Sequence, residues 1–68
     1  MNKFCERFTQ LRIESGLKQR EVAERLDLAT SAVSNYEQGT REPSIDVLMK
    51  ICRLFGVTSD YLIGLSEY

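Results

Sequence analysis

The segment QREVAERLDLATSAVSNYEQ, residues 19–38, constrains the fold of this chain most strongly, because its pattern predicts two short helices joined by a tight corner. Val22, Ala23 and Leu26 recur at helical spacing, the pattern stops at Asp27, and apolar residues then resume on one face of a second helix. The single methyl group of Ala23 allows that second helix to cross the first one closely. We therefore expect the two helices to pack against each other at this point.

The second helix of this pair has an unusual outer surface. Residues 29–36 carry no charge, whereas the solvated face of a helix is usually rich in charged residues. Short neutral side chains allow close approach, so we expect this surface to fit against a partner. The residues that give the surface this character are Thr30, Ser31, Ala32, Ser34 and Asn35.

A characteristic order of residues runs through this segment and beyond it: Gln19, Ala23, Val33, Tyr36-Glu37, Gly39 and Arg41-Glu42-Pro43-Ser44. This order resembles the Cro-and-phage-repressor (XRE-like) type of helix-turn-helix protein. The resemblance extends over about residues 8–64 through Leu11-Arg12, Gly16-Leu17, Gly56-Val57 and Asp60-Tyr61-Leu62. It implies an all-α, five-helix, lambda-repressor-like DNA-binding domain in which helices two and three form the helix-turn-helix.

The length of 68 residues predicts one domain, residues 1–68, with one small core. A hydrophobic content of 43% and a charged content of 28% are typical of a soluble globular protein. No segment approaches the roughly 18 apolar residues that a membrane-spanning helix needs. The N-terminal MNKFCERFTQ has charges where a signal peptide has its apolar core, so we expect a cytoplasmic protein without membrane contact.

Metal-binding and catalytic groups are scarce in this chain. It has no histidine, and its two cysteines, Cys5 and Cys52, are expected to be reduced thiols, with Cys52 a small core residue. It has no glycine-rich phosphate loop and no serine in a nucleophile-elbow context. We therefore expect no metal, no cofactor and no enzymatic activity.

Apolar periodicity predicts five helices. The first spans residues 3–14, with Phe4, Phe8 and Leu11 facing the core, and it ends at Ser15-Gly16. The others are expected at residues 19–26, 30–37, 45–55 and 59–63. Ser44 and Thr58 are the expected N-caps of the last two. The inward stripe of the fourth helix is expected to consist of Ile45, Leu48, Ile51, Cys52 and Phe55.

Two positions depart from the pattern of the family. Lys18 stands where the family usually has Ser or Thr, so the second helix lacks a side-chain N-cap, which costs roughly 1 kcal/mol. Asp27 stands at the corner, where the family favours glycine because the backbone often takes a positive φ. Aspartate tolerates that conformation better than most residues, so we expect the corner to form with some strain.

The resemblance also implies an ion pair between Arg12 and Glu37. Arg12 lies toward the inner side of the first helix, and in the family an arginine here pairs with the glutamate that Glu37 matches. A buried pair of this kind is better evidence for a specified geometry than for added stability. The alternative is that the two residues are separate surface charges.

The second helix of the motif is expected to lie in the major groove of B-DNA, which admits an α-helix. Asn35 can bond bidentately to N6 and N7 of adenine, while Ser31 and Ser34 can donate or accept. Thr30 offers a hydroxyl and a methyl group. The resemblance places base contacts at Thr30, Ser31 and Asn35. The alternative is that these side chains are simply exposed and polar.

Phosphate contacts are expected around this helix. Gln19 begins the preceding helix, where free backbone amides and the positive end of the helix dipole favour an anion. The resembling proteins use this glutamine on a phosphate. Lys18, Thr40 and Arg41 flank the same surface. Such contacts set the register on DNA and carry little sequence information.

These inferences favour a sequence-specific regulator of transcription that binds double-stranded DNA, most simply a repressor. The net charge of −1 argues mildly against DNA and predicts modest non-specific affinity. One alternative is a protein-interaction module on the same fold, such as an antirepressor or a regulatory subunit. RNA binding or catalysis is a third and weaker alternative. Gln19 and Arg41 favour DNA, because phosphates need them and a protein partner does not.

A homodimer on a near-palindromic operator is expected, because one helix reads only a few base pairs and two-fold symmetry doubles that information. The small core cannot hide every apolar residue near the C-terminal end, and exposed apolar patches often mark contacts. The alternative is that Tyr61 and Leu65 merely cover the end of the bundle. The candidate interface consists of Leu54, which is expected off the inner stripe of the fourth helix, and of Tyr61, Leu65 and Tyr68.

Overall fold

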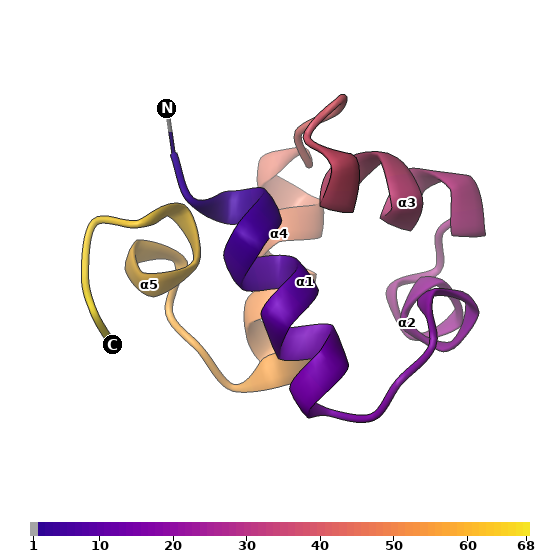
Figure 1. Ribbon diagram of the computed structural model, residues 1–68, viewed down its shortest axis with the longest axis horizontal. Coiled ribbons are helices and arrows are strands. Elements are labelled where there is room, and N and C mark those ends of the chain that lie inside the picture. Colours follow the sequence, from indigo (N-terminus) through magenta and orange to yellow (C-terminus); the bar gives the residue numbers. More distant parts are fainter. Residues whose placement is uncertain (1) are drawn as a thin grey trace.

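The computed structural model describes residues 2–68, and in this range the chain forms five α-helices and no strand (Figure 1). The helices are α1 (Phe4–Glu14), α2 (Gln19–Leu26), α3 (Thr30–Gln38), α4 (Ile45–Phe55) and α5 (Ser59–Ile63). This confirms the predicted all-α, five-helix fold, and each helix begins and ends within one residue of its predicted position. Within residues 2–68, no helix has the length and apolar character needed to cross a membrane.

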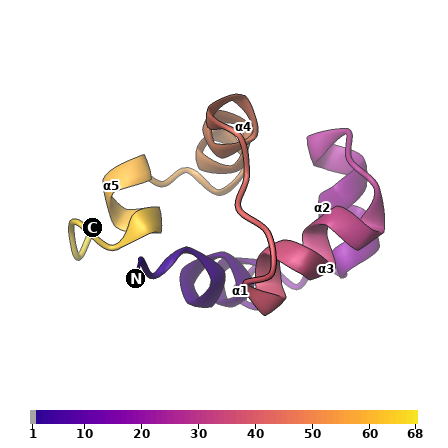
Figure 2. The same cartoon turned by 90° about the horizontal axis from the view of Figure 1, so that it is seen from above.

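The five helices surround one aromatic-rich core. In Figure 1, α1 runs through the middle with α4 behind it, α5 on one side, and α2 and α3 on the other. Figure 2 shows α4 on one side of the molecule and α1 and α3 on the opposite side. Phe8 is fully buried, stacks on Phe4 with ring centroids 5.3 Å apart, and meets the rings of Tyr36 and Phe55 edge-on. The rest of the buried core comprises Val22, Ala23, Leu26, Ala32, Val33, Ile51 and Leu62.

The corner between α2 and α3 depends on a left-handed residue. Asp27 has a φ of +59° and is the one non-glycine residue within 2–68 with a positive φ. This turn brings the backbone N–H of Leu28 to the carbonyl of Ala23, at 2.8 Å. Ala23 itself is buried where α2 packs on α3, as its small side chain predicted.

The start of α2 is capped in a way that the sequence analysis missed. Lys18 cannot accept a hydrogen bond, because its ammonium group has only donors. The carboxylate of Glu21 instead accepts the backbone N–H of Lys18 at 2.8 Å, which is the reciprocal half of a capping box. Ser44 and Thr58 cap α4 and α5 with their side chains, as predicted.

Two predictions about the faces of α4 are wrong. At 3.6 residues per turn, Ile45 lies about 120° around the helix from the buried Ile51, and Leu54 lies about 60° from it. The side chain of Ile45 is accordingly 77% exposed rather than part of the inward stripe. Leu54 is partly buried against the core and lines a 360 Å³ hollow with Leu26 and other residues at the end of α2. It therefore faces α2 and does not lie off the inner side of α4.

The strain at the corner between α2 and α3 gives a first prediction. Asp27→Gly is expected to be more stable than Asp27→Ala by about 1 kcal/mol, because glycine lacks the Cβ that clashes at a positive φ. Wild type should lie between the two variants, and urea unfolding midpoints measure the order. Glu24→Gly, in the interior of α2, is the control and should lower stability. Equal midpoints for Asp27→Gly and Asp27→Ala would show an unstrained corner.

Candidate nucleic-acid interface

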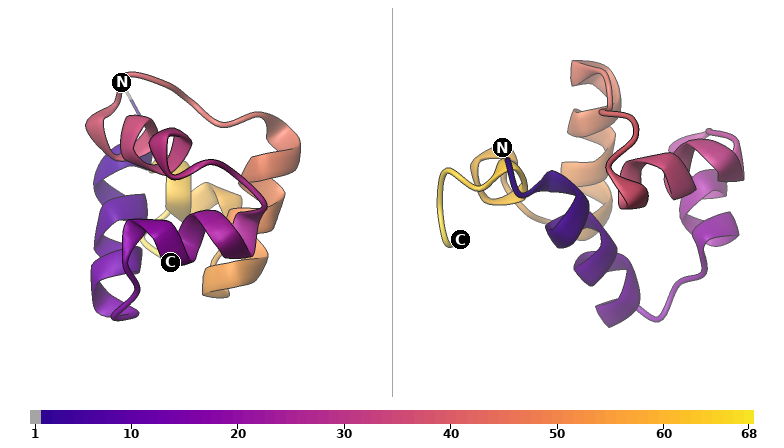
Figure 3. Two further views of the ribbon diagram at one scale, coloured as in Figure 1. Left: turned by 90° about the vertical axis from the view of Figure 1, so that its right-hand side faces the viewer. Right: turned by 45° about the horizontal axis from the view of Figure 1, so that its top comes forward.

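The outer face of α3 carries the short polar side chains noted in the sequence. Thr30 and Ser31 are exposed, and Ser34 and Asn35 are partly buried. In the left view of Figure 3, α2 and α3 lie across the side of the molecule that faces the viewer. The opposite, buried side of α3 consists of Ala32, Val33 and Tyr36.

Ser34 and Asn35 differ in how far the protein itself uses their hydrogen-bonding groups. Ser34 Oγ accepts from Nε2 of Gln38 at 3.1 Å, so its own hydroxyl proton stays available as a donor. Within residues 2–68, the side-chain amide of Asn35 has no hydrogen-bond partner, so both its oxygen and its NH₂ group are available. A bidentate contact with a base edge requires both of these groups.

The carboxylate of Glu37 joins the first three helices. It accepts hydrogen bonds from Arg12, with Nε 2.5 Å from Oε2 and Nη2 3.2 Å from Oε1, and from Nε2 of Gln19 at 3.0 Å. The side chains of Arg12 and Glu37 are only 18% and 9% exposed. Arg12 also donates to the carbonyl of Leu17 at 3.0 Å. The fold thus brings the two residues of the expected pair into bidentate contact and adds Gln19 to it.

Gln19 can still bind an anion while it donates a hydrogen bond to Glu37. Its Nε2 carries two hydrogens, of which one is directed to Glu37. Its backbone N–H lies in the first turn of α2 and has no intrahelical acceptor. The positive charge of Arg12 compensates Glu37, so this carboxylate adds no net negative charge beside Gln19. The exposed Lys18 directly precedes it.

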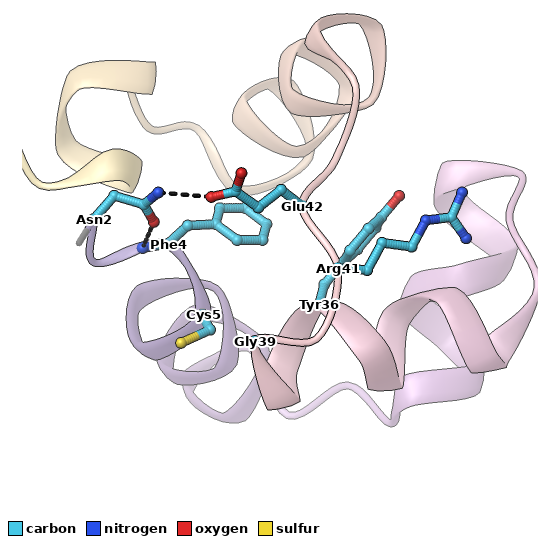
Figure 4. Close-up of a pocket in the computed structure, with 7 residues that line it drawn as sticks. All are labelled: Asn2, Phe4, Cys5, Tyr36, Gly39, Arg41 and Glu42. Atoms are coloured by element: carbon cyan, nitrogen blue, oxygen red, sulfur yellow. Dashed lines mark hydrogen bonds between the residues drawn. The ribbon is translucent and has the colours of Figure 1, made fainter.

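Arg41 and Glu42 follow α3 and point in opposite directions (Figure 4). Glu42 turns toward Asn2, whose Nδ2 donates to its carboxylate at 2.8 Å, while Asn2 Oδ1 accepts the N–H of Phe4 at 2.9 Å. Arg41 extends away from this contact. Both residues border a 260 Å³ hollow whose other lining residues are Asn2, Phe4, Cys5, Tyr36 and Gly39. The Asn2–Glu42 hydrogen bond therefore holds this acid apart from the neighbouring cation.

Thr40 already forms hydrogen bonds to the C-terminal end of α3. Its backbone N–H and its hydroxyl both donate to the carbonyl of Asn35, at 3.1 Å and 3.3 Å, next to Gly39 with its φ of +79°. A phosphate offers only acceptors, so the Thr40 hydroxyl must turn away from Asn35 to contact one. The side chain of Arg41 has no hydrogen-bond or ion-pair partner among residues 2–68. It is therefore better placed than Thr40 to contact a phosphate.

The residues predicted for a dimer interface lie in two places. Leu65 and Tyr68 are 76% and 90% exposed in the tail that follows α5. Tyr61 is partly buried, with the guanidinium of Arg7 over its ring. Leu54 packs on the side of α4 that faces α2. Leu65 and Tyr68 are thus the two members of the set whose apolar side chains are mostly exposed.

The sequence analysis did not predict the contacts of three side chains that hold loops and helix ends in place: Asn2, Arg7 and Glu21. Glu42, which Asn2 contacts, and the partners of Arg7 lie 40 or more residues away along the chain, so no local pattern reveals these contacts. Glu21 is different, because its spacing of three residues from the N-cap position is a recognised capping-box pattern.

Both cysteines are free thiols, as expected. Cys52 is partly buried against the core, and this burial raises the pKa of its thiol. Among residues 2–68, no three His, Cys, Asp or Glu side chains gather into a group that could hold a metal ion.

The family of this chain follows from its match to known proteins. Residues 9–62 match the model of the helix-turn-helix family, and the chain therefore belongs to that family. It is 39% identical over 62 residues to the HTH-type transcriptional regulator ImmR of Bacillus subtilis, covering 91% of this chain and 49% of ImmR. It is 31% identical to the cryptic phage CTXphi transcriptional repressor RstR of Vibrio cholerae, over 94% of this chain and 58% of RstR.

A solved structure supports the same conclusion. The crystal structure of a transcriptional regulator from Listeria innocua matches the fold with a TM-score of 0.90 and 33% sequence identity, over 94% of this chain and 60% of that one. This chain spans about half the length of the curated relatives named above. The relatives and the solved structure described above are named as transcriptional regulators or repressors and not as enzymes, in agreement with the prediction that the chain is not an enzyme.

The Glu37 network gives a second prediction. Glu37→Ala should destabilise the fold by about 3 kcal/mol, because it leaves the largely buried guanidinium of Arg12 without its anion. This is the low end of the range for a buried pair, since Arg12 keeps some solvent and its bond to Leu17. The exposed Glu24→Ala is the matched control and should change stability by less than about 1 kcal/mol. Thermal melts that coincide for the two variants would contradict the prediction.

Proposed function

We propose that this chain is a sequence-specific regulator of transcription that binds double-stranded DNA and reads the major groove with α3. The observation that carries the proposal is the neutral outer face of α3, together with Gln19, which hydrogen-bonds to Glu37 in the last turn of α3, and the exposed Arg41 in the loop that follows. Base edges in the groove require short donors and acceptors, and the phosphates beside the groove require cations and N–H groups. A protein partner would fit the neutral face but would not need both flanking groups.

The contacts divide into those that read bases and those that hold phosphates. Base contacts are assigned to Thr30, Ser31, Ser34 and Asn35, and phosphate contacts to Lys18, Gln19, Thr40 and Arg41. Asn35 is the strongest candidate for base recognition, because its amide has no partner within residues 2–68 and can bond bidentately to adenine. Gln19 and Arg41 are the strongest candidates for phosphates.

We further propose a symmetric homodimer on a near-palindromic operator, with half-sites about 34 Å apart. Two-fold symmetry supplies the information that a single α3 lacks. The proposed outcome of binding is repression, because a dimer that covers a promoter blocks transcription without any further contact, and the related RstR is named as a repressor. We also propose a cytoplasmic location, because the proposed operator DNA lies there.

Selection of bound sequences from a random duplex pool tests the proposal directly. The expected result is a two-fold symmetric sequence, and a reporter with that sequence in its promoter should be transcribed less when the chain is expressed. Increased transcription would keep the DNA-binding function and overturn the repressor role. No enriched sequence, together with affinity that does not fall with salt, would favour the protein-interaction module on the same fold.

The role of Asn35 gives a third prediction. Asn35→Ala should reduce discrimination at one base position per half-site by about 1–3 kcal/mol, because it removes a bidentate base contact. Repeating the duplex selection with this variant measures the change. Gln19→Ala should instead weaken binding to all sequences by similar factors. An unchanged sequence preference for Asn35→Ala would mean that α3 does not read bases through this residue.

The role of Arg41 gives a fourth prediction. Arg41→Gln should lower the slope of log affinity against log salt by about 0.9 per protomer, because one phosphate contact is lost. Affinity titrations at several salt concentrations measure the slope. Arg53→Gln removes the same charge from the exposed surface of α4 and should leave the slope as in wild type. If both variants shift the slope equally, Arg41 acts only through the net charge.

A further inference from the structure

The outer surface of α4 carries an apolar strip that residues 2–68 leave uncovered. Ile45 is 77% exposed and Met49 is 47% exposed. At 3.6 residues per turn these two side chains lie about 40° apart around the helix, so they form one strip along it. The strip borders a 310 Å³ hollow between α4 and the start of α5, which we call the apolar hollow. Its lining residues are Ile45, Leu48, Met49, Cys52, Arg53, Val57, Thr58 and Ser59.

A cationic strip lies beside the apolar one. Around α4, Arg53 and Lys50 follow Met49 by about 40° and about 100°. Both line the 360 Å³ hollow between α4 and the end of α2, which Arg25 lines from α2. The side chains of these three cations are exposed, and none has a hydrogen-bond or ion-pair partner within residues 2–68. Asp27 is the one acid in this range that lines the same hollow, so the three cations outnumber it.

The excess of positive charge at this hollow contrasts with the net charge of −1 of the whole chain. Because like charges repel, an anion bound between the cations lowers the free energy of this surface. Arg53 lines both hollows, so the apolar and the cationic parts adjoin each other. Exposed apolar patches often mark contacts with a partner, and complementary charge selects which partner binds. The partner of this surface is therefore one that presents apolar and acidic groups side by side.

The two hollows lie away from the outer face of α3. In the left view of Figure 3, α3 lies above α2, and the C-terminal end of α4 lies below it. None of the residues to which we assign base or phosphate contacts lines either hollow. The phosphates of an operator held by α3 are therefore not the anions that these cations meet, and the surface stays open while DNA is bound.

We propose that the outer surface of α4 docks an acidic amphipathic helix of a second, different protein. Parallel apolar and cationic strips on α4 match a helix that carries apolar residues on one strip and carboxylates on the next. Its apolar side chains enter the apolar hollow beside Ile45 and Met49, whose flexible thioether adapts to their shape. Its carboxylates pair with Arg53, Lys50 and Arg25. This inference goes beyond the proposed function and does not depend on it.

Selection from a library of random peptides of about 16 residues, long enough as a helix to span α4, tests the proposal. Wild type selects the peptides, and the double variant Lys50→Glu and Arg53→Glu removes those that bind elsewhere. Enriched peptides should be negatively charged, with apolar residues at helical spacing. One enriched peptide is then synthesised and titrated into wild type by NMR. The amides of residues 45–58 should shift, whereas those of Thr30–Gln38 should not.

Charge reversal separates specific pairing from a general loss of structure. The double variant should bind the peptide at least about tenfold more weakly than wild type, because attraction becomes repulsion. A copy of the peptide with Lys in place of each acid should bind the double variant at least about tenfold more tightly than it binds wild type. Arg20→Glu reverses an exposed charge of α2 outside both hollows and should behave as wild type. Ile45→Gln should weaken peptide binding at an unchanged melting temperature, because Ile45 is exposed.

Other occupants give different results, and each of these overturns the proposal. If inorganic triphosphate shifts the same amides as strongly as the peptide does at equal concentration, the surface is a phosphate site. If the free chain associates with itself and Ile45→Gln abolishes this association, the surface is an interface between copies. Absence of any enriched peptide, equal affinity for the acidic and the Lys peptides, or shifts on α3 in place of α4 overturns it as well.

A duplex selected from the random pool distinguishes this proposal from the proposed function. Peptide and duplex should bind the chain together, because they occupy different sides of α2. Competition between them at equal sites overturns the docking surface and leaves DNA binding intact. If the chain binds the acidic peptide through α4 but binds no duplex, the docking surface stands and the proposed function fails.

Discussion

The pairing of Arg12 with Glu37, joined by the hydrogen bond from Gln19, governs how α1, α2 and α3 meet. Removing two charges from water costs several kcal/mol per ion, and their attraction offsets this only when the geometry is good. A different tilt of α3 would leave a largely buried carboxylate unpaired, so the network excludes that tilt more than it stabilises the fold. The orientation of α3 is thereby coupled to α1, outside the helix-turn-helix itself.

The first helix contacts two separate parts of the fold through two arginines. Arg12, in its last turn, reaches α3 and the loop before α2, whereas Arg7, in its first turn, reaches α5 and the tail. Five residues at 3.6 per turn place these side chains about 140° apart around the helix, so each serves a different side. Phe4 and Phe8 of the same helix are buried in the core. In a small domain with one core, such long-range hydrogen bonds contribute much to fixing the orientation of the helices.

Local patterns predicted the helices well because caps and periodicity involve neighbouring residues. The faces of α4 were harder, since apolar residues surround much of this helix and only packing against α2 and α5 selects the inner side, which is why Ile45 and Leu54 were misassigned. The contact of Asn2 with Glu42 and those of Arg7 with residues 61–67 escaped notice because these partners lie 40 to 60 residues away along the chain. The DNA contacts stay predictions, because they depend on a partner and not on the fold alone.

The acids near α3 explain how a chain with a net charge of −1 can present a face suited to phosphates. Three of them are engaged within the protein: Glu37 by Arg12, Glu21 by the backbone N–H of Lys18, and Glu42 by Asn2. The charge of Glu37 is balanced by Arg12, whereas Glu21 and Glu42 keep their negative charge and are held in place by neutral donors, Glu42 on the side away from Arg41. In the proposed DNA complex, the net charge supplies no long-range attraction, so affinity would have to come from local contacts. With few phosphate contacts per protomer, the proposed two-fold pairing would be the physical route to a specific complex.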